Sequence, residues 1–150
     1  MKRFLIPAVI FLSLLVPAHA ARIDVNQRTH ILTLYQDNGE VITYPVGTGR
    51  PGFTWSGTHP ISRKAEWPDW RPPAAMLRRR PDLPHFMAGG EDNPLGARAM
   101  YLGGTNYRIH GSNEPNTIGH SVSSGCIRMR NNDVVDLYNR VKVGTLVTVR

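Results

Sequence analysis

The sequence predicts a mainly β domain with one short helix near its C-terminal end. Segments rich in β-branched and aliphatic residues are short and lie between turn residues, which is typical of strands. Near the end of the 150-residue chain, one segment repeats its apolar residues with the period of a helix. The chain also holds 12 prolines and 14 glycines, and these residues interrupt long regular elements.

Residues 1–20 have the composition of a secretory signal peptide. Lys2 and Arg3 give a basic start, an apolar run follows over 4–16, and residues 18–20 read Ala-His-Ala, a small-residue cleavage pattern. The run is shorter than the roughly 20 apolar residues that a membrane-spanning helix needs, so we do not expect an integral membrane protein. An uncleaved N-terminal anchor is the less favoured alternative. We therefore expect a signal peptide over 1–20 and one secreted domain over 21–150.

The first part of this domain is expected to form a strand and a hairpin. Residues 23–25 alternate apolar and polar side chains, and 29–35 is rich in β-branched and aliphatic residues. The sequence Asp-Asn-Gly at 37–39 predicts a turn, and 41–46 resumes the strand pattern. Residues 47–57 are glycine-rich and are expected to form a loop.

The middle of the chain, residues 67–95, is rich in proline. Long regular elements are not expected there, although 76–80 can form one helical turn. A long irregular stretch within a compact domain is more often a functional loop or lid than a simple connection. Beyond it, 99–102 and 107–110 are expected to form two short strands.

The predicted helix lies near the C-terminal end of the chain. Asn132 or Asp133 is expected to cap it, and Gly144 follows its end. Its apolar residues have the spacing i, i+3, i+4, i+7 and are Val134, Leu137, Tyr138 and Val141. Residues 146–149 then predict a closing strand.

The charge of the chain excludes little. The formal net charge is +7, which falls to +5 without Lys2 and Arg3, and basic residues cluster only at Arg78, Arg79 and Arg80. Such an excess suits a polyanionic surface, although a solvated basic face is the simpler explanation. No recognition-helix pattern, zinc-finger spacing or aromatic RNA-binding motif is found, so no nucleic-acid partner is expected.

Cys126 is the single cysteine of the chain, so no intramolecular disulfide can form. A free cysteine is often a small buried hydrophobe, and it can also be a nucleophile. His110 ends a predicted strand and could accept the thiol proton, and Arg128 adds positive charge near the thiol. The backbone amides of Ser124, Gly125 and Cys126 could converge as an oxyanion hole, because glycine permits a tight turn. The spacing alone leaves both interpretations of the cysteine open.

A zinc site built from His110, His120 and Cys126 is the less favoured alternative. The sequence has no close ligand pair of the C-x-x-C or H-x-x-x-H kind. We therefore expect neither a metal nor a cofactor.

Residues 110–129 resemble a known family signature. His-Gly at 110–111, sixteen residues before the cysteine of a Ser-Ser-Gly-Cys-Ile-Arg-Met run at 123–129, is similar to the signature of the L,D-transpeptidase (YkuD) catalytic domain. The resemblance extends over essentially all of 21–150 and includes residues 44–49, 70–73, 93–96, 101–103, 132–134, 137–138 and 143–145.

The resemblance implies a β-sandwich-like fold with a short helix, no cofactor and a periplasmic, cell-wall-associated location. It implies that Cys126 is the nucleophile and His110 the general base, with an oxyanion hole from the backbone amides of Ser124, Gly125 and Cys126. Peptidoglycan stem peptides would be the substrate. The thiolate would attack the amide between the third residue of the stem and its terminal D-alanine.

The resemblance also implies contacts with substrate. Arg128 would orient the site or hold a substrate carboxylate. Gly111 would line the substrate-binding site. Ser123 would either contact the substrate or have a structural role. The acyl acceptor stays open: an amine would give a 3–3 cross-link, a link to a wall-anchored protein or D-amino-acid exchange. Water would make the enzyme an L,D-carboxypeptidase.

Two positions depart from the family pattern. Ser124 stands where many members have His, which keeps open the alternative of a non-catalytic peptidoglycan-binding module with the same fold. The sequence Thr-Trp-Ser-Gly at 54–57 replaces the commoner Thr-Pro-x-Gly. The second departure affects the loop next to it.

Overall fold

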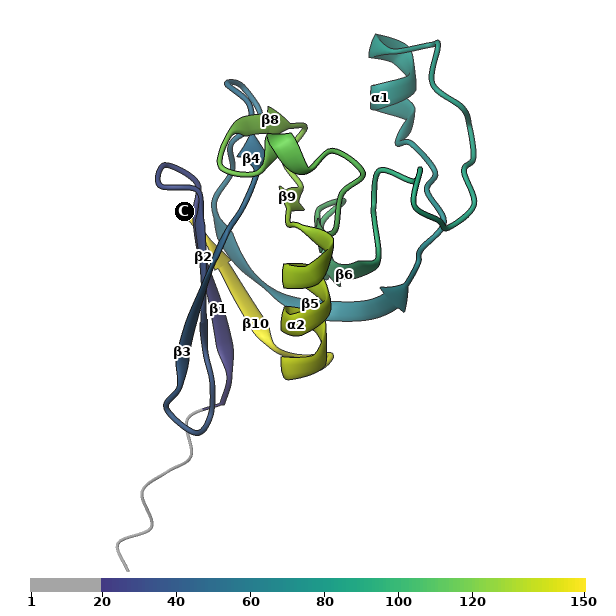
Figure 1. Ribbon diagram of the computed structural model, residues 1–150. Coiled ribbons are helices and arrows are strands. Elements are labelled where there is room, and N and C mark those ends of the chain that lie inside the picture. The colour runs from purple at the N-terminus through teal and green to yellow at the C-terminus, as the bar shows by residue number, and fades with distance from the viewer. Residues whose placement is uncertain (1–19) are drawn as a thin grey trace, which may run out of the picture.

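The computed structural model describes residues 20–150 (Figure 1), so the predicted signal peptide lies outside the described residues except for Ala20. Its strands are β1 (Arg22–Asn26), β2 (Ile31–Tyr35), β3 (Val41–Pro45), β4 (Thr48–Gly49), β5 (Gly57–Glu66), β6 (Arg98–Leu102), β7 (Arg108–His110), β8 (Ser121–Ser123), β9 (Ile127–Arg128) and β10 (Leu146–Val149). Its helices are α1 (Ala74–Arg79), the 3₁₀ turn η1 (Pro115–Thr117) and α2 (Asn131–Arg140). The predicted fold class, mainly β with one short helix near the C-terminus, is confirmed.

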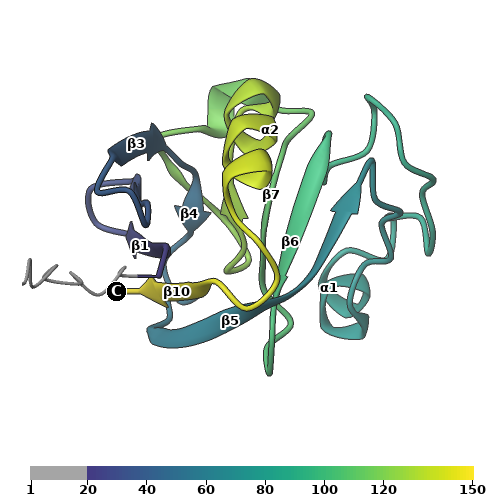
Figure 2. The same ribbon diagram turned by 90° about the horizontal axis from the view of Figure 1, so that it is seen from below.

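Eight of the strands form one curled sheet in the order β3-β2-β1-β10-β5-β6-β7-β9, and β4 pairs with β8 beside it. The ten-residue strand β5 belongs to both arms of the sheet, because it pairs with β10 through its first half and with β6 through its second. Its register shifts between Ile61 and Arg63, and Figure 2 shows the strand sweeping from one arm to the other. The curl lets a single sheet enclose a core on two sides.

The core lies between the two arms and α2, which sits in the hollow of the sheet (Figure 2). Strands β1 and β2 alternate buried and less buried residues, as the half-buried strands of such a sheet do. Burying a large aliphatic side chain contributes about 1.5–3 kcal/mol. Fully buried members from both arms and the helix include Ile23, Leu32, Leu34, Ile61, Met100, Ile109, Ile127 and Leu137.

The predicted hairpin and the two short strands before His110 are confirmed, but β5 was not predicted. Residues 47–57, expected as loop, contain the two-residue β4 and the first residue of β5. Burial alternates over residues 57–61 of β5, but Ile61 is the single buried residue of the strand, so its sequence shows no repeated apolar–polar pattern. Its place in the sheet is therefore set by pairing with β10 and β6.

Helix α2 forms where the apolar spacing predicts it, but the predicted cap at Asn132 or Asp133 is wrong. The N-cap residue is Arg130, and no side chain caps the helix there. The carbonyl oxygen of the Asn131 side chain instead accepts hydrogen bonds from the backbone N–H groups of Ala97 (3.0 Å) and Ser112 (3.2 Å). The first turn of α2 is thus used to fix the segment that follows His110.

The C-terminal end of α2 is capped by a lysine from β5. Lys64 Nζ donates to the backbone carbonyls of Tyr138 (2.6 Å) and Val141 (2.7 Å) and lies 3.9 Å from the centre of the Tyr138 ring. A cation at this end also meets the negative end of the helix dipole. The contact ties α2 to the sheet.

The proline-rich stretch projects from the body of the domain and carries α1 (Figure 1). Its base is held by Asn93, which is buried and whose Nδ2 donates to the carbonyls of Pro68 (3.1 Å) and Ala88 (3.0 Å). None of the residues of α1 is buried. Among residues 20–150, no helix is both long and apolar enough to span a membrane.

Candidate active site

The parallel pairing of β7 with β9 brings the histidine and the cysteine together. Ile109 lies opposite Ile127, and His110 lies opposite Arg128. Residues opposite one another share a face of the sheet, and successive residues alternate between faces. His110, Arg128 and Cys126, which directly precedes β9, therefore share one face, and the two isoleucines point into the core.

The His110 imidazole is buried and held by the backbone of the next residue. Its Nδ1 lies 2.5 Å from the carbonyl oxygen of Gly111. A carbonyl oxygen accepts and does not donate, so Nδ1 carries the proton and Nε2 is the free base. Burial lowers the pKa of His110 to about 3, with the charges of Arg108 and Arg128 adding to the effect and the bond to Gly111 opposing it. The imidazole is therefore neutral at pH 7.

The Cys126 thiol is in a similar environment. Burial raises the pKa of the thiol, while the charge and the backbone N–H of Arg108 and the charge of Arg128 lower it. The net shift is upward, so the resting group is a thiol. Its reaction as a nucleophile needs a base to take its proton.

The loop before Cys126 is fixed by its own hydrogen bonds. Ser123 is buried, and its Oγ donates to the carbonyl of Cys126 (2.6 Å) and accepts from the N–H of Gly125 (3.1 Å). Gly125 has a φ of 118°, and a Cβ added there would overlap the ring of Tyr107. Among residues 20–150, the backbone N–H groups of Ser124 and Cys126 have no hydrogen-bond acceptor. They are the donors of this loop that an incoming oxygen could use.

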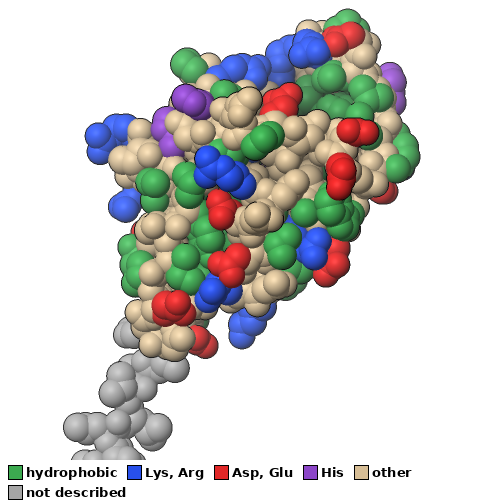
Figure 3. Space-filling model, viewed as in Figure 1, with side chains coloured by type: hydrophobic (Ala, Val, Ile, Leu, Met, Phe, Trp, Pro, Cys, Tyr) green, Lys and Arg blue, Asp and Glu red, His purple; other side chains and the backbone are tan. Residues whose placement is uncertain are grey.

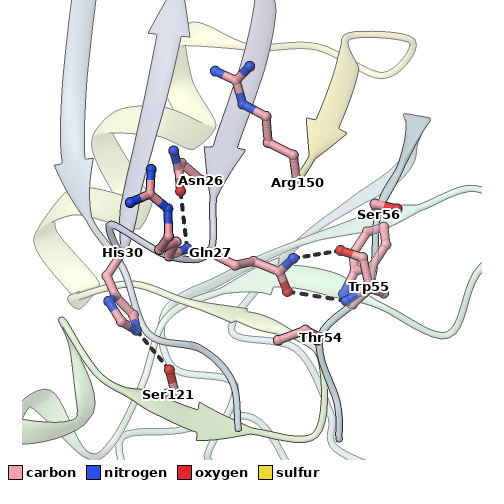
Figure 4. A pocket seen from close by; sticks show the side chains of 9 residues that line it. Asn26, Gln27, His30, Thr54, Trp55, Ser56, Ser121 and Arg150 are labelled. Atoms are coloured by element: carbon pink, nitrogen blue, oxygen red, sulfur yellow. Dashed lines mark hydrogen bonds between the residues drawn. The ribbon is translucent and has the colours of Figure 1, made fainter. Parts of the chain in front are cut away.

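Trp55, which is distant from Cys126 in the sequence, supports the same loop. Its indole N–H donates to the carbonyl of Gly125 (2.8 Å), and its ring stacks on Tyr107 with ring centres 4.5 Å apart. The backbone of Trp55 is held by the Gln27 side chain, whose Nε2 donates to the Trp55 carbonyl (2.6 Å) and whose Oε1 accepts from the Trp55 N–H (3.4 Å), as Figure 4 shows. The turn after β1 is thereby linked to the cysteine loop.

A hollow of about 1080 Å³ lies beside this brace, with Gln27 and Trp55 in its lining (Figure 4). Its lining includes Gln27, His30, Trp55, Ser121 and Arg150, and neither Cys126 nor His110 is part of it. His30 and Ser121 lie 2.9 Å apart, Nε2 to Oγ, across its wall. The hollow adjoins the cysteine loop through Trp55 and does not contain the reacting atoms.

Arg128 and Gly111, both expected to contact substrate, have defined partners. Nη1 of Arg128 lies 3.3 Å from a carboxylate oxygen of Glu114, and its side chain is 23% exposed. The Arg128 backbone exchanges two hydrogen bonds with Gly47 (2.8 and 2.9 Å). Gly111 has no room for a side chain, because a Cβ there would overlap the carbonyl oxygen of the Asn131 side chain. The Arg128 side chain is thus paired with Glu114, whereas the glycine serves close packing.

Ser124 stands between the cysteine and two arginines that the sequence did not single out for the site. Its Oγ accepts hydrogen bonds from Nη1 of Arg50 (3.2 Å) and Nη2 of Arg79 (3.4 Å). Arg108 and Trp55 were missed as well. The two-residue alternation of β7 could have indicated Arg108, but no local pattern indicates contacts that join residues 45 to 74 positions apart.

The zinc alternative is not assembled in residues 20–150, where no three His, Cys, Asp or Glu side chains lie close enough to hold a metal ion. His120, one of its three proposed ligands, is exposed.

Known proteins share both the sequence and the fold. The model of the YkuD L,D-transpeptidase catalytic domain matches residues 20–149. The Escherichia coli K12 protein named "Probable L,D-transpeptidase ErfK/SrfK" is 40% identical over 121 residues, 75% of this chain and 38% of the relative. YqjB of Bacillus subtilis is 37% identical over 83% of this chain and 68% of its own length.

Solved structures agree at the level of the fold. L,D-transpeptidase 3 from Mycobacterium tuberculosis superposes with a TM-score of 0.71 at 19% identity, over 87% of this chain and 61% of that one. The chain spans less than two fifths of the length of the E. coli relative, so it corresponds to one part of that protein. With the domain model matched over almost all described residues, this chain belongs to the YkuD family of L,D-transpeptidase catalytic domains, which are enzymes.

Proposed function

We propose that the chain is a peptidoglycan L,D-transpeptidase that works through an acyl-thioester on Cys126. The observation that carries the proposal is the common face of His110 and Cys126, with the imidazole locked so that Nε2 is the unprotonated nitrogen. A neutral base beside a neutral thiol is the resting state that general-base catalysis requires.

In the first half-reaction, Nε2 of His110 takes the proton from the Cys126 thiol as the sulfur attacks the carbonyl carbon of the third stem residue. The developing oxyanion accepts hydrogen bonds from the N–H groups of Ser124 and Cys126, because that of Gly125 is already bound to Ser123. His110 then donates its proton to the amine of D-alanine. The C–N bond breaks, D-alanine leaves and a thioester remains.

In the second half-reaction, an acceptor amine attacks the thioester and gives its proton to His110. The carbon–sulfur bond breaks and the thiol is restored. The positive charges of Arg108 and Arg128 stabilise a thiolate on Cys126 and make a protonated His110 a stronger acid. They therefore favour proton delivery from His110 to the leaving amine.

The remaining predicted site residues take supporting roles in this proposal. Ser123 holds the oxyanion loop through its two internal bonds, and Gly111 supplies the carbonyl that orients His110. Arg128 exchanges Glu114 for a carboxylate of the substrate. Export by residues 1–20 would deliver the enzyme to the periplasm, where peptidoglycan lies.

The proposal is tested by incubating the purified protein with a disaccharide-tetrapeptide and measuring D-alanine release. Release by the unaltered chain and none by Cys126→Ala is the expected result, with a thioester mass on the intact protein during turnover. Equal release by both proteins would overturn it. Binding of sacculi without turnover by either protein would instead identify a non-catalytic module.

The acceptor is identified from the products of the same reaction. A dimer joined through two third residues indicates a 3–3 transpeptidase, and a hydrolysed tripeptide indicates an L,D-carboxypeptidase. Adding a free D-amino acid tests exchange, and adding a lysine-bearing protein tests anchoring.

A further inference from the structure

Two arginines from separate segments converge on one hydroxyl near the proposed nucleophile. Arg50 follows β4, and Arg79 is the last residue of α1 on the projecting proline-rich stretch. Their guanidinium groups donate to the same Ser124 Oγ from 3.2 and 3.4 Å. Ser124 lies two positions before Cys126, so both charges are close to where an acyl donor would bind.

The ring of Phe53 keeps the two guanidinium groups together. The guanidinium carbon of Arg50 lies 4.1 Å from the centre of the ring, and that of Arg79 lies 5.0 Å from it. Arginine stacks well on aromatic rings, which holds its planar fork in a set orientation. Arg50 lies before the proline-rich stretch and Arg79 lies within it, and the ring of Phe53 contacts both guanidinium groups.

Neither arginine is neutralised within the part of the chain that the structure describes. Arg80 pairs with Asp82 (2.6 Å) and Arg128 with Glu114 (3.3 Å), but no carboxylate lies within ion-pair distance of Arg50 or Arg79. Two like charges placed on one neutral hydroxyl repel each other unless an anion joins them. Figure 3 shows Lys and Arg side chains gathered along the edge of the molecule where Figure 1 places α1 and the β4–β8 pair.

We propose that Arg50, Arg79 and Ser124 form a carboxylate-binding subsite for the acyl-donor stem peptide; this rests on the proposed function. Two guanidinium forks match the two oxygens of a carboxylate, and the Ser124 hydroxyl has a proton left to donate. A tetrapeptide stem offers a C-terminal carboxylate, and it offers a second one where its third residue is a diamino diacid. The chemistry recognised is the same in both cases.

The subsite also gives the proline-rich stretch a function. Its base is fixed by Asn93, while α1 at its tip is exposed and meets the cysteine loop through Arg79. A bound carboxylate would join the tip to the body of the enzyme. The stretch is therefore one wall of the acyl-donor site.

The test measures binding by calorimetry in a Cys126→Ala background, where no turnover occurs. The probes are a disaccharide-tetrapeptide with both carboxylates free, two forms with either one amidated and a form with both amidated. We expect each of Arg50→Gln and Arg79→Gln to weaken binding of the free form by about tenfold. Arg78→Gln, which removes the same charge from a neighbouring exposed position of α1, is the matched control and is expected to change binding less than twofold.

The outcomes separate the two proposals. Loss of affinity on amidating one carboxylate identifies that group as the one bound, and the arginine variants should then be insensitive to its amidation. Equal binding of the free and doubly amidated peptides, or equal effects of Arg78→Gln and Arg79→Gln, would overturn the subsite. Carboxylate-dependent binding through Arg50 and Arg79, with no D-alanine release by the Cys126 enzyme, would leave the subsite standing and sink the transpeptidase proposal.

Discussion

Two groups of residues contact the cysteine loop, and they are built in different ways. Gln27, Trp55 and Tyr107 hold it with hydrogen bonds between uncharged groups and with a stacked pair of rings. Arg50 and Arg79 reach it with charged side chains, and Arg79 is exposed. In the first group, the Gln27 amide and the Trp55 indole N–H are bonded within the protein, whereas the second group has a shared hydroxyl and no counter-charge among residues 20–150. The first is therefore suited to fixing backbone geometry and the second to recognising a ligand.

The largest effect is expected from a substitution at Gly125, where Tyr107 of the uncharged group packs against the cysteine loop. Gly125→Ala places a Cβ on the Tyr107 ring at a φ of 118°, so the loop and the ring must separate. We expect a loss of D-alanine release of more than a hundredfold and a fall in the free energy of unfolding of about 2–4 kcal/mol. Turnover and denaturant unfolding measure the two effects.

Gly119→Ala is the matched control for that variant. Gly119 also has a positive φ, 88°, but a Cβ there meets nothing within 4 Å. It isolates the cost of the backbone conformation, about 1 kcal/mol. Equal losses of activity in both variants would show that contact between Tyr107 and Gly125 does not matter.

The second prediction concerns pH and separates the neutral catalytic pair from the charged arginines. The folded-state pKa of His110 is about 3, below its unfolded value near 6.5, so the unfolded chain binds more protons between these values. The free energy of unfolding should thus fall by a few kcal/mol as the pH drops from about 6.5 toward 3. Burial raises the pKa of Cys126, so stability should also fall as the pH rises above the unfolded thiol value near 8.5.

Denaturant titrations across this range measure both losses of stability. In His110→Gln, the free energy of unfolding should fall less as the pH drops from about 6.5 toward 3. In Cys126→Ala, it should fall less as the pH rises above about 8.5. The double variant Arg50→Gln, Arg79→Gln should show both losses of stability unchanged. If His110→Gln lost as much stability at low pH as the unaltered chain, that result would contradict the burial of a neutral imidazole.

A third prediction concerns Trp55 as a positioning residue. Trp55→Phe keeps a ring on Tyr107 and removes the hydrogen bond to the Gly125 carbonyl. We expect kcat to fall about tenfold, KM to stay within twofold and stability to fall by about 1 kcal/mol. Arg79→Gln should show the reverse, with KM raised and kcat little changed. A change of KM alone in Trp55→Phe would remove the distinction between the two groups.

The smallest effect is expected at Ser124. Ser124→Ala removes the hydroxyl that both arginines bind but keeps the backbone N–H proposed for the oxyanion. We expect a two- to fivefold rise in KM and an unchanged kcat, because the arginines can still reach a carboxylate. Steady-state kinetics measure both values, and a large fall in kcat would show that the side chain itself takes part in the reaction.

Local patterns in the sequence predicted the parts of the fold that depend on local periodicity. The hairpin of β1 to β3 and the apolar face of α2 follow from residues that are near one another in the chain. The strand β5 and the cap of α2 could not be predicted, because pairing with distant strands fixes the first and Arg130 occupies the cap position. Asn131 illustrates the same limit, since its side chain serves Ala97 and Ser112.

The candidate site divides in the same way. The signature around Cys126 and His110 indicated which residues to consider, and the parallel pairing of β7 with β9 supplies their common face. The contacts of Ser124 with Arg50 and Arg79, and of Trp55 with Gly125, join segments 45 to 74 positions apart. The curled sheet brings these distant segments together, so the contacts between them leave no pattern among neighbouring residues in the sequence.

The bond between His110 and the Gly111 carbonyl has a consequence for how such a site can change over time. Many catalytic histidines are oriented by an acidic or amide side chain, and a single codon change can remove that partner. Here the partner is the main chain, which every amino acid at position 111 would supply. The orientation of the base therefore depends on the backbone conformation at position 111. Selection must preserve the glycine there, because a larger residue would overlap the Asn131 side chain.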